Sequence, residues 1–388
     1  MAVTDEELFD GLQLPKEPAK PPKTTGVKEI VLEEKMTVDE IKAREGTYFS
    51  EKDADTIYDE DIDIYAKDPE APGGKRLLLK LRKNVIPHEI VKLGWKSFYN
   101  AAGASRNRGA AAGPIDVKSK YWTRRKLNKQ SIKGWSAQYM EKGKLSKMRV
   151  NNNVFSSVLG YFEKTPFMGL PCRLTSYTQR YFKEYKMGIP YIEAIDEVFK
   201  KLVPERYKVQ HKRAEANSAF QIKDTAFSSV TINRNFRTGL HMDAGDLREG
   251  FGNLSVIERG KYKGGFTIFP RYKIGINLRT ADFVAMDVHE WHCNTELTES
   301  AKEKKYNESL KDIYKNDKET GTQGIEKLFS RVSFVCYLRE KLAECKAKDS
   351  IPYYKRIGYN PRTETLDKKK KQARQTTGAR QTRKKRKE

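Results

Sequence analysis

The sequence predicts an α+β protein in which a β-sandwich or barrel is flanked by helices and by disordered termini. From residue 219 to 345, short apolar runs are separated by Gly, Asn and Pro, which is typical of closely spaced strands. A strongly periodic helix precedes them at residues 190–204. Both ends of the 388-residue chain are rich in charge and poor in aromatic residues. The chain is long enough to bury a large core in one or two domains.

Charge is distributed very unevenly along the chain. Residues 1–70 contain 20 Asp and Glu against 9 Lys and Arg, a net charge of −11, while the whole chain carries +24. Because few aromatic residues accompany these charges, we predict an acidic, mostly disordered segment over residues 1–75, with one short helix near residues 37–45. The rest of the chain therefore carries a net charge of +35.

A body with so large a positive charge is expected to associate with a polyanion, and nucleic acid is the most common one. A basic surface that only keeps the protein in solution, or that binds an acidic protein, is the alternative. The chain contains no run of about 18 apolar residues, so no membrane span is predicted.

The four cysteines, Cys172, Cys293, Cys336 and Cys345, are scattered and show no CxxC spacing. This pattern argues against a zinc ribbon or a disulfide framework and favours a reducing compartment. The acidic N-terminus contains no apolar segment typical of a secretory signal. We therefore expect an intracellular protein, nuclear if the host is eukaryotic.

Residues 76–218 are predicted to form a basic α/β region that covers the core and contacts nucleic acid. They begin with the strand-like run KRLLLKLRKNVIP and continue with the loop SRNRGAAAG at residues 105–113. Arg106 and Arg108 in this loop are candidates for phosphate contacts beside the loop glycines.

The next segment, residues 118–149, interleaves Lys and Arg with aromatic residues. Cations for phosphates and aromatic faces for stacking are what a nucleic-acid surface needs, so Arg124 and Arg125 are further candidate contacts. The alternative is a solvated basic face whose aromatic residues turn to the core. The aromatic residues concerned are Tyr121, Trp122, Trp135 and Tyr139.

Residues 190–204, PYIEAIDEVFKKLVP, carry a clear helical signal. An apolar stripe recurs at helical spacing, Pro190 suits the first turn, and Pro204 stops the helix. We interpret this helix as scaffold. The stripe consists of Ile192, Ile195, Val198, Phe199 and Leu202.

Two further segments are set apart by their charge. Residues 299–328 are predicted to be a charged helical insertion between strands of the core. Residues 346–388 are predicted to be a C-terminal extension that ends in the polybasic tail DKKKKQARQTTGARQTRKKRKE. Such a tail is either a nonspecific nucleic-acid arm or a nuclear-import signal.

Chemistry is indicated first by His241 and Asp243, which lie two residues apart in FRTGLHMDAGD. On a strand, residues at this spacing point to the same face. A second stretch, DVHEWHCN, supplies a third candidate ligand, either His289 or His292. We prefer His292 because it falls where a strand should end, whereas His289 stands beside Glu290 and suits a supporting role. Two histidines and one carboxylate form the facial set that holds Fe(II) and leaves three positions open.

Arg331 and Ser333 open the alternating run RVSFVCYLRE, so they face the same way on a strand. A dicarboxylate cosubstrate needs a planar cation that grips its distal carboxylate with two hydrogen bonds, and this is Arg rather than Lys. A hydroxyl two residues further on completes that grip. Asn235 and Arg237, just before His241, are further candidates for seating the cosubstrate. The alternative is an Arg–Ser pair on the outside of a barrel.

The order His-x-Asp, distal His and Arg-x-Ser resembles the Fe(II)/2-oxoglutarate-dependent dioxygenases. More closely, TINRNFRTGLHMDAGD, the HCN that follows and the loop SRNRGAAAG resemble the TET/JBP branch. The resemblance covers residues 100–345 and implies a double-stranded β-helix (jelly-roll) core at residues 219–345. It also implies Fe(II), 2-oxoglutarate and O2, held by the metal and cosubstrate residues named above. The charged insertion departs from the compact spacing common in this superfamily.

The resemblance further implies the reaction. Members of the TET/JBP branch hydroxylate the methyl group of a modified pyrimidine in DNA, which gives a 5-hydroxymethyl base, succinate and CO2. Because a methyl group inside a duplex is out of reach, the base must be extruded into the site. A basic, aromatic-bearing surface suits a protein that holds DNA in this way.

The resemblance also implies which residues touch the extruded base. In this branch they stand three residues beyond the ligand Asp and eight beyond the cosubstrate Arg, which here are Asp246 and Arg339. A carboxylate at Asp246 can accept from the exocyclic amine of 5-methylcytosine, which slightly favours that base over thymine. The same carboxylate can also accept from N3–H of thymine, and Arg339 can donate to O2 of either base. An ordinary surface salt bridge is the alternative for both residues.

Two other functions stay open at this point. One is a 2-oxoglutarate oxygenase that acts on RNA or on a protein, and the other is a nucleic-acid-binding jelly-roll protein without a metal. The complete order of ligands and cosubstrate arginine argues against the second. The basic body argues for a long polyanion rather than a peptide as the substrate.

Overall fold

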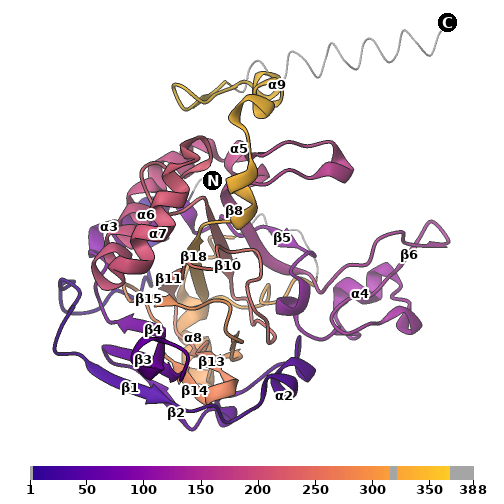
Figure 1. Cartoon of the computed structure of the whole chain (residues 1–388). Coiled ribbons are helices and arrows are strands. Elements are labelled where there is room, and N and C mark those ends of the chain that lie inside the picture. The colour runs from indigo at the N-terminus through magenta and orange to yellow at the C-terminus, as the bar shows by residue number, and fades with distance from the viewer. Residues whose placement is uncertain (1–2, 315–320, 368–388) are drawn as a thin grey trace, which may run out of the picture.

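The computed structural model describes residues 3–314 and 321–367 and combines two sheets with helices packed on the outside (Figure 1). The predicted mixture of a strand-rich core with flanking helices is confirmed. The large sheet runs in the order β1 (Lys28–Leu32), β3 (Ile62–Lys67), β4 (Lys75–Arg82), β15 (Phe283–Met286), β11 (Gly252–Arg259), β18 (Ser330–Tyr337), β10 (Ser229–Arg234), β8 (Val154–Phe162) and β5 (Ala104–Ser105), with β9 (Arg173–Leu174) paired to β8.

The remaining elements form a small sheet, three short ladders and the helices. The small sheet runs in the order β16 (Cys293–Asn294), β13 (Thr267–Phe269), β14 (Ile274–Ile276) and β2 (Thr56–Tyr58). The ladders are β12 (Lys263–Gly264) with β17 (Leu297–Thr298), β19 (Tyr359–Asn360) with β20 (Thr365–Leu366), and β6 (Met140–Glu141) with β7 (Lys144–Leu145). The helices are α1 (Asp5–Phe9), α2 (Val38–Ala43), α3 (His88–Phe98), α4 (Lys120–Arg125), α5 (Ser176–Arg180), α6 (Phe182–Leu202), α7 (Pro204–Glu215), α8 (Ala301–Ser309) and α9 (Ala347–Ile357).

The two faces of the large sheet carry different kinds of residue. Phe334 of β18 is buried against Phe98 of α3 and Tyr191 of α6, with ring centroids 5.9 and 4.8 Å away. Arg331 and Ser333 of the same strand line a cavity on the opposite face. Because side chains alternate along a strand, this sheet builds the core on one face and a polar site on the other.

Helix α6 begins eight residues before the predicted start, so Pro190 lies inside it instead of in its first turn. The helix tolerates this proline because it packs very closely on α3. A Cβ on Gly188 would lie 2.1 Å from the ring of Phe98, and one on Gly94 would lie 2.6 Å from the ring of Tyr191. Only glycine allows this approach, and the packing offsets the lost helical hydrogen bond. At the predicted end, α6 stops at Leu202 and Pro204 opens α7.

The acidic N-terminal segment is folded, so the prediction that residues 1–75 are mostly disordered is wrong for the residues described. Strands β1 and β3 join the large sheet, and β2 joins the small one. Ile62, Ile64 and Ala66 are fully buried in a cluster between the two sheets. The composition of the segment hid this alternation, because the charged residues between the apolar ones dominate its average.

The short helix predicted near residues 37–45 is confirmed as α2. Thr37 and Glu40 form a reciprocal capping box at its start, which satisfies two N–H groups that the helix itself leaves without a partner.

A buried ion pair ties the N-terminal segment to the sheet. Nη2 of Arg82 lies 2.7 Å from Oδ1 of Asp63, and Nζ of Lys80 lies 2.8 Å from Oδ2 of the same carboxylate. Arg82 is fully buried and Asp63 is 4% exposed. The charge of the segment therefore completes the sheet as well as making its surface acidic.

Two sequence-based expectations about the core are corrected. From its sequence alone, the run GINLRTADFVAMD at residues 275–287, which precedes the second histidine motif, is expected to be a hairpin. Its two strands, β14 and β15, belong instead to different sheets. Cys172 and Cys345 form a disulfide across 173 residues, so the prediction against disulfides is wrong for this pair. Sequence spacing does not report proximity across such a distance. Cys293 and Cys336 are buried and free.

The aromatic residues of the basic segment 118–149 mostly face inward, as the alternative interpretation held. Tyr121 and Trp122 are buried and form a small core with Ala137 and Val150. In Figure 1 this region, with α4 and β6, projects from the side of the large sheet. Its basic side chains thus sit on a folded unit with a core of its own.

In its described residues, the charged insertion predicted at residues 299–328 contains one helix, α8, whose Ser300 caps the first turn. Residues 315–320 and the polybasic tail from residue 368 lie outside the described residues. Where the structure describes the chain, no helix is long and apolar enough to cross a membrane.

The buried ion pair generates a stability prediction. Replacing Asp63 with Ala leaves the guanidinium of Arg82 buried without its counter-charge, so the free energy of unfolding should fall by about 3–5 kcal/mol. Glu33→Ala is the control, because Glu33 pairs with Lys67 where both side chains are exposed, and it should cost about 0–1 kcal/mol. Urea unfolding of the two variants measures both values. Equal, small losses would mean that the N-terminal segment is not docked on the sheet.

Candidate metal and cosubstrate site

A cavity of about 380 Å³ opens on the face of the large sheet that carries Arg331 and Ser333. Its walls come from β10 and β18, from the loop at residues 105–113, and from the segments that contain the two histidine motifs. Apart from Asn235 and Arg237, it brings together every residue preferred as a ligand of metal, cosubstrate or base, and one predicted phosphate contact. These residues are His241, Asp243, His292, Arg331, Ser333, Asp246, Arg339 and Arg108.

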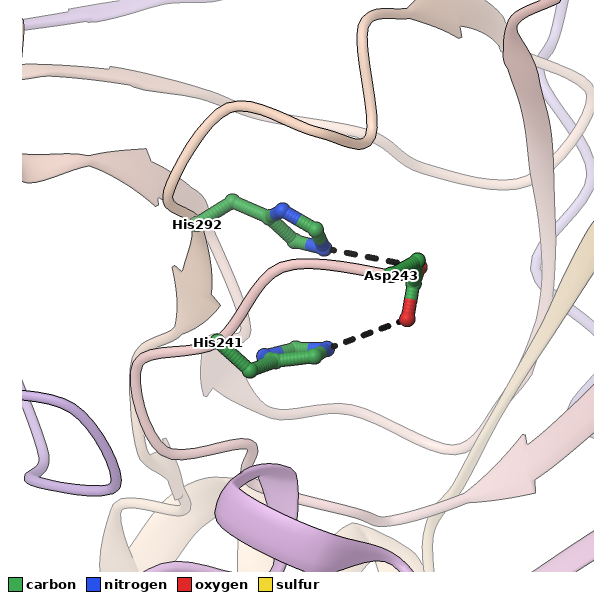
Figure 2. Close-up of side chains that lie close together, drawn as sticks. All are labelled: His241, Asp243 and His292. Carbon is green, nitrogen blue, oxygen red and sulfur yellow. Dashed lines mark ion pairs between the residues drawn. The ribbon is translucent and has the colours of Figure 1, made fainter. Parts of the chain in front are cut away.

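The side chains of His241, Asp243 and His292 converge in this cavity (Figure 2). Nε2 of His241 lies 3.7 Å from Oδ1 of Asp243, and Nε2 of His292 lies 3.8 Å from Oδ2 of the same carboxylate. All three ligand atoms lie within 4.8 Å of one another. Donor atoms that share one ion, with bonds of about 2.0–2.2 Å, lie within about 4 Å of one another, so small side-chain movements suffice to bind it.

The backbone holds the two histidines together. The N–H of His241 donates to the carbonyl of His292, and the reverse hydrogen bond is also made, both at 3.0 Å. Asp243 follows outside any strand and donates its N–H to the carbonyl of Val288. The prediction that His241 and Asp243 share a continuous strand is therefore wrong. A single bridge followed by a turn brings their side chains together instead.

Each histidine is oriented by a hydrogen bond from Nδ1. His241 donates to the carbonyl of Gly239 and His292 to that of Glu290, both at 2.9 Å. These bonds leave Nε2 of both rings directed at the carboxylate. Burial lowers the pKa of His241 to about 4, and the neighbouring His292 acts in the same direction. The ring of His241 is therefore neutral at pH 7, as a metal ligand must be.

The other candidate, His289, does not join the cluster. Its Nδ1 lies 3.7 Å from Oδ1 of Asp287, whose carboxylate raises the pKa of His289. The supporting role falls to Glu290, which is 3% exposed and accepts hydrogen bonds from Arg76 at 2.5 Å and from Tyr272 at 3.1 Å. This network holds the turn that carries the third histidine of the cluster.

Arg331 is only 7% exposed, and its Nε has no hydrogen-bond partner among the described residues. The backbone N–H of Arg331 donates to Oδ1 of Asn235, which holds the backbone of Arg331 in place. A Cβ on Gly265 would lie 3.1 Å from Nε, so that glycine leaves room for the guanidinium. A buried guanidinium with an unsatisfied N–H, beside the hydroxyl of Ser333, fits a carboxylate such as that of 2-oxoglutarate.

Arg237, the other arginine predicted to seat the cosubstrate, is committed elsewhere. It donates to Glu296 and to the carbonyl of Phe49, both at 3.2 Å, and lies over the ring of Tyr48. It borders a separate hollow, so the prediction of a direct role is corrected. Asn235 contributes indirectly, through the backbone of the cavity strand.

Asp246 and Arg339 both line the cavity, but they do not form a surface salt bridge with each other. Arg339 donates to both carboxylate oxygens of Glu163, at 2.5 and 2.6 Å. Oδ2 of Asp246 is buried and has no partner in the described part of the chain. Burial raises the pKa of Asp246 well above its usual range, with the charge of Asp243 adding to this and Arg339 opposing it.

The four predicted phosphate contacts are divided between the cavity and the projecting basic unit. Arg108 lines the cavity. Arg106 donates to the hydroxyl of Tyr121 at 3.3 Å, and Arg125 lies over the same ring at 5.0 Å. Arg124 is exposed. The structure therefore does not gather these arginines at one place.

Sequence reasoning missed several polar residues of the cavity. Thr231 and Asn233 of β10 line it, with Asn233 paired in register with Ser333. The alternation of polar and apolar residues in TINRN carried this signal. Thr238 and Asn294 also line the cavity and are joined by a hydrogen bond of 3.0 Å, which no sequence pattern indicated.

The comparisons with known proteins bear on this site. Residues 157–340, which contain the whole metal cluster and Arg331, match the model of the Tet_JBP family, described as the oxygenase domain of the 2OGFeDO superfamily. This part of the chain is therefore a 2-oxoglutarate/Fe(II)-dependent oxygenase domain. This match confirms the resemblance to the Tet/JBP family that was found in the motifs.

The matching relatives are much longer proteins. The chain is 35% identical over 144 residues to thymine dioxygenase JBP1 of Trypanosoma brucei brucei, which is 37% of this chain and 17% of the relative. It is 33% identical over 146 residues to the bifunctional helicase and thymine dioxygenase JBP2 of Leishmania infantum, which is 37% of this chain and 13% of that protein. The aligned region thus covers less than a fifth of either relative.

Among solved structures, the chain is similar to NgTET1 in complex with 5mC DNA. The sequence identity is 11% and the TM-score 0.46, over 85% of this chain and 91% of that one.

The geometry generates a prediction about metal binding. His292→Ala should weaken binding of Fe(II), measured by anaerobic equilibrium dialysis, by more than about a hundredfold, since losing even a supporting residue commonly costs 10–100-fold. His289→Ala is the control and should retain the metal, because its imidazole faces Asp287. Loss of the metal in the His289 variant, with retention in the His292 variant, would show that His289 is the third metal ligand instead of His292.

Proposed function

We propose that this protein is an Fe(II)- and 2-oxoglutarate-dependent dioxygenase that hydroxylates the 5-methyl group of a pyrimidine base in DNA. The observation that carries the proposal is that two imidazole Nε2 atoms, one carboxylate and a buried, unsatisfied arginine Nε share one cavity. This donor set fits Fe(II), and the arginine fits the distal carboxylate of 2-oxoglutarate. The two sheets around the cavity are interpreted as a double-stranded β-helix.

In this mechanism His241, Asp243 and His292 hold Fe(II), and Arg331 with Ser333 orients 2-oxoglutarate. When bound, the metal and cosubstrate supply the oxidant that converts a C–H bond to C–OH, with decarboxylation to succinate. The protein residues place the methyl group within reach of that chemistry. Because the ring of His241 is neutral and its Nδ1 carries the proton, Nε2 is free to bind the metal.

The charge of the chain supports DNA as the partner. Residues 115–150 contain 11 Lys and Arg against 2 Asp and Glu and form the unit that projects beside the large sheet. Such a surface suits the phosphate backbone of a duplex. A cavity of about 380 Å³ has room for a single extruded base. A protein that acts on DNA works inside the cell, in the nucleus if the host is eukaryotic.

The target base is thymine or 5-methylcytosine. The relatives JBP1 and JBP2 are named thymine dioxygenases, which supports thymine. The carboxyl group of Asp246 supports the other base, since it can accept from the amine of 5-methylcytosine. Because that carboxyl group can equally accept from N3–H of thymine, the relatives outweigh it, and we propose thymine as the substrate base.

Turnover on defined duplexes tests this function. The protein is reconstituted anaerobically with Fe(II) and then supplied with 2-oxoglutarate, oxygen and a duplex in which uracil replaces every thymine except one. Mass spectrometry of the nucleosides should show 5-hydroxymethyl-2′-deoxyuridine together with an equal amount of succinate. Succinate without any modified nucleoside would leave an oxygenase whose substrate is RNA or protein.

The cosubstrate site generates a separate prediction. Arg331→Lys loses the two-pronged grip on a carboxylate, so calorimetry should show binding of 2-oxoglutarate weakened by about tenfold to a hundredfold. Arg237→Lys is the matched control and should leave the affinity unchanged, because Arg237 is paired with Glu296 outside the cavity. An equal effect of the two changes would place the cosubstrate elsewhere.

A further inference from the structure

Arg108 is a cationic side chain in the cavity that neither the metal nor the cosubstrate uses. Its Nε is buried, and no hydrogen-bond partner for it exists among the described residues. Burial lowers the pKa of Arg108, while Tyr337 and Asp243 act in the opposite direction, so its charge lies near both. A buried N–H without a partner is costly, which indicates that a ligand completes it.

The loop that carries Arg108 is held firmly at its base. Oδ1 of Asn151 accepts hydrogen bonds from the N–H groups of Arg108 and Gly109, both at 2.9 Å. Nδ2 of Asn152 donates to the carbonyl of Ala112 at 3.0 Å. On its other side, the loop lies so close to Gly239 that a Cβ there would be 2.9 Å from the carbonyl of Ala110. The position of the guanidinium is therefore set before any ligand binds.

Arg108 lies at the end of the cavity away from the cosubstrate arginine. Its charge interacts with Tyr337, the last residue of β18, and with Arg339 just beyond that strand. Arg331 stands at the near end of that strand, six residues before Tyr337, which at 3.3 Å per residue is about 20 Å along the strand. The metal ligand Asp243 is close enough to influence Arg108. A group bound by Arg108 therefore lies beside the metal, on the side opposite the cosubstrate, where the substrate base must be.

The hydrogen-bonding groups at this end differ in what they can recognise. A guanidinium only donates, whereas a carboxyl group can serve more than one base. The pairing edge of thymine presents two carbonyl acceptors on either side of one N–H donor. The edge of 5-methylcytosine presents one carbonyl acceptor, a ring nitrogen acceptor and an amine donor. Two arginines and one carboxyl group, as in Arg108, Arg339 and Asp246, match the pattern of thymine.

We propose that Arg108 is the residue that selects thymine over 5-methylcytosine, by donating to O4 of the extruded base. The proposal rests on the proposed function and adds to it the group that sets base preference. An amine facing Arg108 would leave two donors opposed in a buried site, which is the strongest form of rejection that a polar pocket offers. Asp246 cannot discriminate between the two bases in this way, because it can accept a hydrogen bond from either.

The test compares base preference in three proteins. Two duplexes are mixed in equal amounts, one with a single thymine and one with a single 5-methylcytosine at the same position, with uracil replacing all other thymines. Arg108→Gln introduces an amide that can accept from an amine, so the ratio of hydroxylated thymine to hydroxylated 5-methylcytosine should fall by about tenfold to a hundredfold. Arg108→Lys still only donates and should keep the preference for thymine at a lower rate.

Lys92→Gln is the control for loss of one positive charge. Lys92 pairs with Glu89 on α3, which packs on the face of the sheet opposite the cavity. This change should leave the ratio unchanged. Binding of both duplexes to metal-free protein supplies a second readout, in which Arg108→Gln should weaken binding of the thymine duplex more than that of the 5-methylcytosine duplex.

Three results would overturn the proposal while leaving the proposed function intact. An unchanged product ratio in Arg108→Gln would show that another residue selects the base. Equal weakening of both duplexes, with the ratio unchanged, would make Arg108 a phosphate contact. Loss of 2-oxoglutarate binding in calorimetry would make it a cosubstrate residue. If instead the unaltered protein hydroxylates neither base, the proposed function itself fails.

Discussion

The site depends on one backbone interaction, the pair of hydrogen bonds between His241 and His292. These two bonds, each 3.0 Å long, join residues that are 51 positions apart in the chain. Both rings then donate from Nδ1 to the carbonyl two residues earlier, so the same short bridge sets their separation and their orientation. Because Asp243 turns back from the first segment onto Val288 of the second, its carboxylate meets both rings. Loss of this bridge would separate every ligand at once.

The large sheet supports the polar site on one face because its other face is packed into the apolar core. Its central strands present apolar residues to α3 and α6 and polar residues to the cavity, so each strand serves both. Arg331 and Ser333 alternate along β18 with Val332 and Phe334, which pack into the core on the other face and hold the strand in place. The unsatisfied donors of Arg331 and Arg108 lie within this rigid frame. Rigid, incompletely satisfied groups are what allow a pocket to bind one carboxylate and one base in fixed places.

Much of the site was predictable from sequence, because its residues stand in short local motifs. His241, Asp243, Arg331 and Ser333 were recognisable by spacing, and His292 by its place at the expected end of a strand. The structural reason for that spacing was not predictable, since a single bridge and a turn replace the expected strand. The N-terminal segment was misjudged because its buried pairs, such as Asp63 with Arg82, require contacts that composition does not report. For the same reason Arg108 was expected at a phosphate, whereas its loop folds into the cavity.

The central claim is that oxygen, metal, cosubstrate and the methyl group meet in this one cavity. The most direct test is turnover of a thymine-containing duplex under ¹⁸O2, with both products analysed by mass spectrometry. The account predicts one heavy oxygen atom in the hydroxymethyl group and the other in succinate, in equal amounts. Hydroxymethyl product whose oxygen comes from water, or label in succinate with the base unchanged, would contradict it.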